Sequence, residues 1–564
     1  MNPQDRTALA IAATLAATGV RHVVASPGSR HTPLLLALDN HPDLSVSVHH
    51  DERSAGFVAL GIGKATGIPA VLVCTSGSAV SHYFPAVVEA DLATTPMIIV
   101  SADRPHELWG RGAPQTINQR EIFGSTVRAY SSIDPDRVGE TANTNLVSWL
   151  MSHWRFAVSP TPGPVHLNVE LREPLLPADS GAIDDVAPSP IDSVVSSAIQ
   201  PTDGTGLVSA LQTCERPLLV AGRLTREDSR AVQAFAEYLG APVFADPQSG
   251  LRSPKDTNTI RYADVLAGAG VLDHSAPDLV LRCGPIPTSK PIWTWLGNHP
   301  EVPQYVITAS GIHDPMGSAA VVVTSPIADT LVATQTRLSR PSRDFVTTWA
   351  HHDQLAAAVL DGELRTAAIT EPAIAATVAA TCTAADSLVV ASSMPIRDLD
   401  SWGSQWNAKR TIANRGANGI DGTVSTAIGV AMVTDGHTVL YMGDTAALHD
   451  IGALAAVARL VPDLTILVVN NNGGGIFHHL AQGDPSTLDS DQFERLYGAP
   501  HGLSFASTAS AFGVNSITAV SMADLSEALS LRTGAPLLIE VNTTRAGAAA
   551  ERERLRGLVR ATLT

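Results

Sequence analysis

Short apolar runs alternate with longer stretches of mixed polarity through the first third of the chain. Strands are predicted at residues 23–25, 45–49, 71–74, 97–101 and 165–169, of which those at 23–25 and 71–74 are apolar throughout. Strands buried on both faces are apolar throughout, and parallel strands are joined by crossovers that are usually helical. The pattern therefore predicts a doubly wound parallel sheet. An earlier apolar stretch, residues 9–20, follows Asp5 and Arg6 without a clear cleavage site, so we expect a first helix reaching about residue 17 rather than a signal peptide.

The same alternation returns in the rest of the chain. In the middle it predicts strands at residues 217–222, 242–244, 279–282 and 305–307. Residues 176–205 are rich in Pro, Ser, Asp and Gly and are predicted to be a linker, and residues 339–370 form a second connection with a predicted helix at 345–360. A chain of 564 residues is long enough for about three domains. We therefore predict an α/β protein with three doubly wound parallel-sheet domains, at residues 1–180, 205–340 and 371–564.

The two ends of the chain resemble each other. Residues 71–73 align with residues 439–441 at an offset of 368 (439 minus 71), and Gly61 aligns with Gly429 at the same offset. An offset this long is too large for a solenoid and predicts two domains of like topology. At this offset Glu52 falls opposite Ile420, whereas Asp444 falls opposite a serine. The two halves therefore contribute different acidic groups.

Charge and cysteine content narrow the class of protein. The chain has 54 acidic and 37 basic side chains, a formal net charge of −17, which disfavours nucleic acid as a partner. Its four cysteines form no CxxC pair and are expected to be reduced thiols. No run of eighteen apolar residues indicates a membrane span. We expect a cytoplasmic protein.

Two clusters of polar residues follow the strands predicted at 438–442 and 464–469. Gly443 and Asp444 come directly after the first strand, and Asn471 and Gly473 come after the second. Adjacent parallel strands deliver such residues to one carboxyl edge, where α/β proteins bind ligands. A carboxylate, an amide oxygen and a backbone carbonyl suit Mg²⁺ that takes its remaining ligands from a diphosphate and water. The alternative is that Asn and Gly make ordinary turns here.

Cationic and polar residues also follow other predicted strands. They are Ser29, Arg30, Arg104, Gln115, Ser393, Arg397, Arg415 and, in the middle domain, Lys290. In so acidic a chain, four arginines at strand ends indicate anion pockets, whereas Lys290 is equally compatible with a surface position. Glu52 follows the second strand and is either an acid favoured by a helix N-terminus or a functional acid. The histidine pairs lack metal-ligand spacing, so no transition-metal site is predicted.

These motifs resemble those of thiamine-diphosphate enzymes of the pyruvate-oxidase and decarboxylase type. These enzymes have a Gly-Asp followed by Asn-Asn in the last domain. They also have a lone glutamate after the second strand of the first domain. The segments SPGSR, HHDERSAG, SADRP, GPVHLNVELREPL, SSMPIR, NRGANGIDGTVSTAIG and NNNGGGIF resemble more specifically the MenD family, the 2-succinyl-5-enolpyruvyl-6-hydroxy-3-cyclohexene-1-carboxylate synthases of menaquinone biosynthesis. The resemblance covers both outer domains and is weak in the middle one.

The resemblance implies a cofactor and residues that bind it. Glu52 matches the glutamate that bonds the aminopyrimidine ring of thiamine diphosphate and promotes loss of the thiazolium proton. Mg²⁺, or Mn²⁺, would be held by Asp444, Asn471 and the Gly473 carbonyl. Ile420 matches the residue that supports the bent cofactor. The remaining matched cofactor residues are Gly443, Thr445 and Ile476. Thr445 is followed by two alanines where the family often has a bulkier residue, which puts the local packing in question but not the ligands.

The resemblance also implies the reaction and the partners. Members of the family decarboxylate 2-oxoglutarate and add the resulting succinic semialdehyde carbanion to isochorismate. By matching, Ser393, Arg397 and Arg415 would face the carboxylate derived from 2-oxoglutarate. Isochorismate would meet Ser29, Arg30, Arg104, Gln115 and Lys290. Cofactor sites in the family lie between subunits, which implies a homodimer or homotetramer.

Two other functions remain open at this point. Another thiamine-diphosphate lyase, such as an acetolactate synthase or a 2-oxoacid decarboxylase, would share the cofactor residues, but it usually needs an apolar acceptor pocket. A nucleotide- or flavin-binding regulator could use the same sheets, but it would not need Glu52 together with Asp444 and Asn471.

Overall fold

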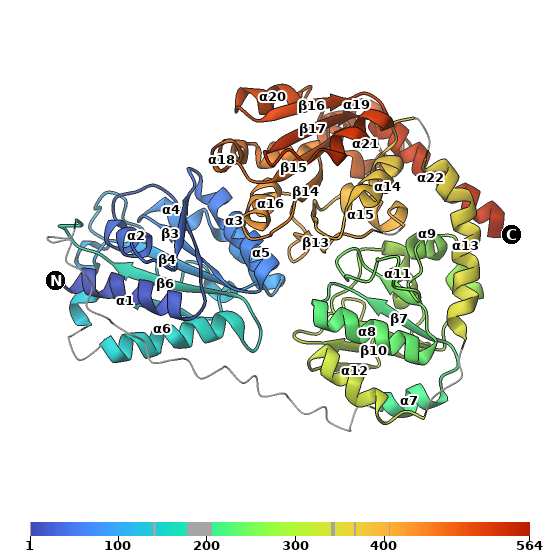
Figure 1. Cartoon of the computed structure of the whole chain (residues 1–564), viewed down its shortest axis with the longest axis horizontal. Coiled ribbons are helices and arrows are strands. Elements are labelled where there is room, and N and C mark those ends of the chain that lie inside the picture. Colours follow the sequence, from blue (N-terminus) through green and yellow to red (C-terminus); the bar gives the residue numbers. More distant parts are fainter. Residues whose placement is uncertain are drawn as a thin grey trace.

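The computed structural model describes residues 2–138, 143–176, 206–339, 344–365, 368–404 and 406–563. Three parallel sheets with helices on their faces make up this part of the chain (Figure 1). The predicted fold class is therefore confirmed. Most of the linker predicted at 176–205 lies outside the described residues, as do residues 340–343 and 366–367 of the second connection.

The first sheet contains six strands in the order β2-β1-β3-β4-β6-β5. Its strands are β1 (His22–Ala25), β2 (Ser45–Val48), β3 (Ala70–Cys74), β4 (Met97–Asp103), β5 (Tyr130–Ile133) and β6 (Pro164–Glu170). Its helices are α1 (Pro3–Ala17), α2 (Thr32–Asp39), α3 (Glu52–Thr66), α4 (Ser78–Ser81), α5 (Phe84–Leu92) and α6 (Asn143–Val158). The sequence did not predict β5, because this edge strand buries only Ile133 and so lacks an apolar run.

The middle sheet has the order β11-β10-β9-β7-β8. Its strands are β7 (Pro217–Ala221), β8 (Val243–Ala245), β9 (Leu279–Cys283), β10 (Gln304–Thr308) and β11 (Val321–Thr324). Its helices are α7 (Leu207–Thr213), α8 (Arg226–Leu239), α9 (Ala263–Gly268), α10 (Val271–His274), α11 (Lys290–Asn298) and α12 (Ile327–Gln335). The helix predicted at 345–360 is α13 (Phe345–Glu363), which leads to the last domain.

The last sheet has the order β13-β12-β14-β15-β17-β16. Its strands are β12 (Ser387–Val390), β13 (Arg410–Ala413), β14 (Thr438–Gly443), β15 (Leu464–Asn470), β16 (Asn515–Ala519) and β17 (Leu537–Asn542). Its helices are α14 (Glu371–Thr381), α15 (Met394–Trp402), α16 (Thr423–Ala431), α17 (Asp444–His449), α18 (Leu454–Leu460), α19 (Ser490–Phe493), α20 (Phe505–Ala511), α21 (Met522–Ser530) and α22 (Arg545–Leu563). This strand order repeats that of the first sheet, so the outer domains share one topology, as the internal repeat predicts.

Helices α3 and α16 join the two outer domains by a close crossing (Figure 1). A Cβ on Gly61 would lie 2.1 Å from the Thr426 carbonyl oxygen. A Cβ on Gly429 would likewise lie 2.1 Å from the Val58 carbonyl oxygen. At the repeat offset of 368, Gly61 corresponds to Gly429 and Val58 to Thr426. The two contacts are therefore equivalent, and a pseudo-twofold axis relates the helices. Only glycine lets the two backbones come this close.

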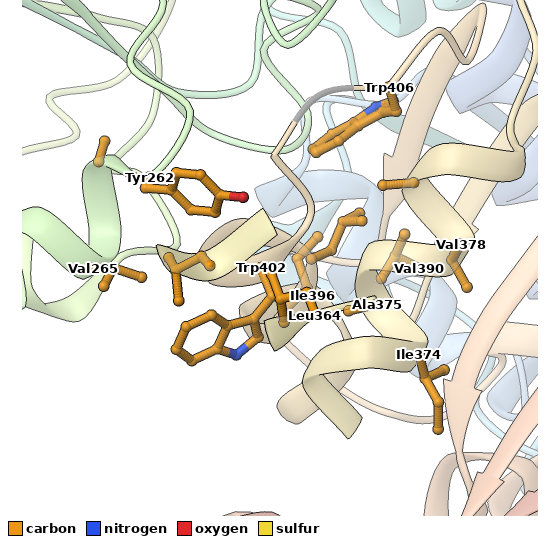
Figure 2. Packing of buried hydrophobic residues seen from close by; sticks show 14 of the residues in the cluster. Tyr262, Val265, Leu364, Ile374, Ala375, Val378, Val390, Ile396, Trp402 and Trp406 are labelled. Carbon is orange, nitrogen blue, oxygen red and sulfur yellow. The ribbon is translucent and has the colours of Figure 1, made fainter. Parts of the chain in front are cut away.

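The middle and last domains share a hydrophobic core. Figure 2 shows Tyr262 and Val265, at the start of α9, facing Ile396 and Trp402 of α15. Arg252 adds a buried ion pair with Asp400 of α15, and its guanidinium also donates to the Asp400 and Gly403 carbonyls. This packing fixes α15, which begins beside the predicted site residue Ser393.

Candidate functional site

Asp444 is buried at the carboxyl end of β14, beside the end of β15. The two strands pair in parallel with Gly443 opposite Val469, so the residues that follow them meet at one edge of the sheet. One carboxylate oxygen of Asp444 accepts from the Thr445 backbone N at 2.5 Å. The other accepts from the backbone N of Asn471 at 3.1 Å and of Gly473 at 2.9 Å. These bonds fix the carboxylate between the two strand ends.

The loop after β15 requires glycine. Gly473 has φ +129°, and a Cβ there would lie 1.9 Å from the Gly498 carbonyl oxygen. A Cβ on Gly474 would lie 2.2 Å from the Tyr497 carbonyl oxygen. The Gly474 backbone N donates to the Gly498 carbonyl oxygen at 2.8 Å. Because the backbone of residues 494–498 covers this loop so closely, side chains are excluded and the loop keeps its shape.

A cavity opens at this edge of the last sheet. Its lining includes the predicted residues Ser393, Ile420, Gly443, Asp444, Thr445, Asn471, Gly473 and Ile476. Tyr441, Val469 and Phe477 make much of the remaining wall apolar. The Asn471 Oδ1 is buried and accepts no hydrogen bond in the described part of the chain. This free oxygen beside a fixed carboxylate fits a hard divalent cation such as Mg²⁺. The apolar wall fits the flat organic part of a ligand whose phosphates would share that cation.

His501 lies near the same carboxylate. Its Nε2 is 3.2 Å from Asp444 Oδ2, close enough for an ion pair. The ring is not aligned for a hydrogen bond, and this nitrogen has no hydrogen-bond partner among the described residues. We therefore regard the pair as a contact that leaves Asp444 available to a cation.

Arg397 follows the cavity-lining residue Ser393 on α15, and its guanidinium lies near that of Arg415 as well as near the carboxylates of Asp398 and Asp400. Burial and the nearby charge of Arg415 lower the pKa of Arg397, and burial lowers the pKa of Arg415. The Arg397 Nη1 donates to the Ser393 carbonyl oxygen at 2.5 Å. Two guanidinium groups that are partly removed from water and repel each other favour an anion between them.

A second cavity adjoins Arg415, between the three domains. It is lined by Lys64 of the first domain, by Arg223, Asp246, Gln248 and His313 of the middle domain, and by Arg415. The loop that carries Arg415 is fixed to α5, because Glu89 accepts from the backbone N of Gly416 at 2.9 Å and of Ala417 at 2.6 Å. Arg223 is not among the residues predicted from the sequence, although it follows strand β7 just as the other arginines follow their strands.

The predicted site residues of the first domain, and Lys290 of the middle domain, lie elsewhere in the same chain. Glu52 is the first residue of α3 and does not line the cavity around Asp444. The Arg30 guanidinium donates to the Leu171 carbonyl oxygen at 3.0 Å and pairs with Glu173 at 3.0 Å. Ser29, Gln115 and Lys290 are exposed. One chain therefore does not bring these residues to the cavity of its own last domain.

Arg104 is positioned by a buried polar network at the ends of β4 and β6. Asn168 donates to Asp103 at 2.8 Å, and the other oxygen of Asp103 accepts from the Arg104 backbone N at 2.7 Å. Gln119 donates to Asn168 Oδ1 at 2.9 Å. Burial raises the pKa of Asp103 to about 6. The Arg104 Nε is buried without a partner in the described part of the chain, so this side chain retains an unused donor.

One further cluster has the residue types of a metal site. His106, Asp134 and Glu170 place ligand atoms within 4.8 Å of one another in the first domain. However, Arg172 pairs with Asp134 at 2.7 Å, and His106 already bonds to Glu170 at 2.9 Å. These partners satisfy the acids, so the cluster needs no metal.

Three buried charged residues behind the Asp444 cavity were not predicted from the sequence either. Glu371 and Asp398 line its wall, and Arg552 of α22 pairs with both. Their partners lie 154 to 181 residues away along the chain, so no local pattern marks them.

Comparison with known proteins identifies the family. Residues 5–122 match the N-terminal thiamine pyrophosphate binding domain of thiamine pyrophosphate enzymes, and residues 400–541 match the C-terminal one. The chain is 39% identical to a 2-succinyl-5-enolpyruvyl-6-hydroxy-3-cyclohexene-1-carboxylate synthase from Chloroflexus aurantiacus over 95% of this chain and 93% of the relative. The chain belongs to this synthase family. A synthase from Bacillus velezensis is 36% identical over 88% of this chain and 87% of its own length.

A solved structure supports the fold. The X-ray structure of a protein described as a thiamin diphosphate-dependent enzyme from Mycobacterium smegmatis superposes with a TM-score of 0.70 at 19% identity, covering 96% of this chain and 99% of that one. Among the described residues, none of the helices has the length and apolar character that a membrane span requires.

Proposed function

We propose that this protein is a thiamine-diphosphate-dependent synthase that decarboxylates 2-oxoglutarate and joins the resulting four-carbon unit to isochorismate. The product would be 2-succinyl-5-enolpyruvyl-6-hydroxy-3-cyclohexene-1-carboxylate, in menaquinone biosynthesis. One observation carries the proposal beyond family membership. The cavity with oxygen ligands for a cation is lined by Ser393, whose carbonyl accepts from Arg397, and Arg397 lies near Arg415, which suits a substrate with a second carboxylate.

The cofactor would be held at the edge of the last sheet. Asp444, Asn471 and the Gly473 carbonyl would bind Mg²⁺ or Mn²⁺ together with the diphosphate. Gly443, Thr445 and Ile476 would surround the diphosphate, and Ile420 would support the ring system from the cavity wall. When bound, thiamine diphosphate supplies a nucleophilic carbon that attacks 2-oxo acids.

Substrate carboxylates would be held by the arginines. Arg397 and Arg415, with Ser393, would bind the distal carboxylate of 2-oxoglutarate through charge-assisted hydrogen bonds. Isochorismate would contact Ser29, Arg30, Arg104, Gln115 and Lys290. Arg30 would have to exchange its present partner Glu173, which is 69% exposed, for the substrate. The unused Nε of Arg104 is already free to donate.

The proposed role of Glu52 needs a second subunit. Its carboxyl group would share a proton with the pyrimidine ring and so promote proton loss at the thiazolium carbon. Glu52 does not line the cavity of its own chain, which supports a homodimer or homotetramer in which first and last domains of different subunits face each other. The four cysteines lie within the described residues, are buried and form no disulfide, which suits a cytoplasmic location.

The test is to incubate the purified protein with Mg²⁺, thiamine diphosphate, 2-oxoglutarate and isochorismate, and to follow the loss of isochorismate and the release of CO₂. We expect both to depend on thiamine diphosphate, and pyruvate to be a poor donor. If pyruvate served as well as 2-oxoglutarate, an acetolactate-synthase-like activity would replace this proposal.

A further inference from the structure

The side-chain amide of Asn471 is held from one side only. Its Nδ2 donates to Glu371 Oε1 at 2.9 Å, while its Oδ1 is buried and accepts no hydrogen bond among the described residues. The two ends of an amide are nearly equal in size, so hydrogen bonds decide which end faces the cavity. Because Glu371 Oε1 accepts from the NH₂ end of Asn471, this contact turns the NH₂ end away and leaves the amide oxygen free.

Glu371 is itself fixed by several donors. It is 3% exposed and begins α14. The Thr543 hydroxyl donates to the same Oε1 at 3.0 Å, and the Arg552 guanidinium donates to Oε2. With both oxygens engaged, the carboxylate cannot turn away from Asn471.

Arg552 links this carboxylate to a second one. It is 2% exposed, and it donates through Nε to one oxygen of Asp398 at 2.7 Å and through Nη2 to the other at 2.5 Å. A buried carboxylate is tolerated only when a charge of opposite sign compensates it. Arg552, which comes from the C-terminal helix α22, therefore gives both Glu371 and Asp398 an ion-pair partner beside the cavity.

We propose that Glu371 and Arg552 are positioning residues for the divalent cation: they orient the Asn471 amide so that its oxygen faces the metal. This inference rests on the proposed role of Asn471 as a ligand. Residues that orient a metal ligand without touching the metal affect affinity because a misoriented ligand must first turn, and removing them costs about 10- to 100-fold in metal affinity.

The decisive variant is Glu371→Gln, with Mn²⁺ as the metal, measured by electron paramagnetic resonance in the presence of thiamine diphosphate. Asn471 and Arg552 donate to different oxygens of Glu371, and a glutamine presents an acceptor oxygen at only one of these two positions. We expect Mn²⁺ affinity to fall by about 10- to 100-fold. Thermal unfolding of the same samples reports stability separately.

The chain offers a matched control on the opposite face of β15. Glu540 is 2% exposed and accepts from the side-chain Nδ2 of Asn470 at 2.8 Å, as Glu371 does from Asn471. Successive residues of a strand point to opposite faces, and Asn470 does not line the cavity. Glu540→Gln should therefore lower stability while Mn²⁺ affinity stays near that of the wild type.

Glu371→Asp provides a second test that keeps the charge opposite Arg552. Its shorter side chain should not reach Asn471, so we expect a loss in the same direction without a large loss of stability. Mn²⁺ affinity within about twofold of the wild type in a folded variant at position 371 would overturn the positioning role and leave the proposed function intact. Failure of the wild-type protein to bind thiamine diphosphate with Mn²⁺ would overturn both.

Discussion

Replacing Gly61 by alanine should force helices α3 and α16 apart. The new Cβ would lie 2.1 Å from the Thr426 carbonyl oxygen, whereas carbon and oxygen normally approach to about 3.3 Å. The helices must therefore separate by roughly 1.2 Å, and a gap of that size forfeits a large part of each dispersion contact across the crossing.

The magnitude follows from two opposing effects. Overpacking costs about 1–3 kcal/mol and more when the neighbour is backbone that cannot rotate away. Alanine in a helix is favoured over glycine by up to about 1 kcal/mol. We therefore expect Gly61→Ala to destabilise the crossing by about 2 kcal/mol. Gly429→Ala, with its Cβ 2.1 Å from the Val58 carbonyl oxygen, should cost the same.

The double variant tests the reasoning most directly. One separation of the helices relieves both overlaps, so the two costs should not add, and the double variant should be little worse than either single one. Hydrogen exchange of the α3 and α16 amides measures this, because a multidomain chain does not unfold in a single transition. Gly557→Ala in α22 is the control, since its Cβ would meet nothing within 4 Å. Additive costs, or Gly61→Ala behaving like the control, would refute the close crossing.

Burial raises the pKa of Asp450 to about 6 from an ordinary value of 3.8, so the folded protein keeps a proton that the unfolded chain releases. The stabilisation that this proton gives the folded wild type is complete below about pH 4 and is lost as the pH rises through 6. Asp450→Asn cannot lose it, so the free energy of unfolding of the variant, relative to that of the wild type, should rise by up to about 3 kcal/mol between pH 4 and 7. A difference that stays constant with pH would contradict this. Arg397→Ala should lower kcat/KM for 2-oxoglutarate by roughly a hundredfold and leave thiamine diphosphate affinity nearly unchanged, whereas weakened cofactor binding would assign Arg397 to the diphosphate. Glu52→Gln should slow exchange of the thiazolium proton, measured by NMR in D₂O, by orders of magnitude; an unchanged rate would leave Glu52 as an ordinary helix-start residue.

The sequence predicted the parts of the fold that depend on local pattern. The strand ends at Asp444 and Asn471 were predictable because each polar cluster follows an apolar strand that is buried throughout. The shared topology of the outer domains was predictable because the repeat preserves core residues and the crossing glycine Gly61. The edge strands β5 and β16 escaped prediction because they are partly exposed: β5 buries only Ile133 and β16 only Ala519, so neither carries an apolar run.

Other features arise only when distant segments meet. The ion pairs of Arg552 join α22 to α14 and α15, and the charge pattern of an amphipathic C-terminal helix does not reveal which side chain will be buried. Arg223 is a different case, because its position after β7 repeats the pattern of Arg30 and Arg397. Applying the strand-end criterion to every arginine would have found it.

The reciprocal contacts of α3 and α16 also bear on how chains associate. The crossing uses the same glycine-to-carbonyl contact on both sides. Helix α3 could therefore pack in the same way against α16 of its own chain or against α16 of another copy. Within one chain the two helices are held at a high effective concentration by covalent connection, so their pairing withstands dilution. An active site that draws Glu52 from one chain and Asp444 from another has no such tether. When the protein is diluted, this site between chains should dissociate, and specific activity should fall. The contact between α3 and α16 within one chain should persist at those concentrations.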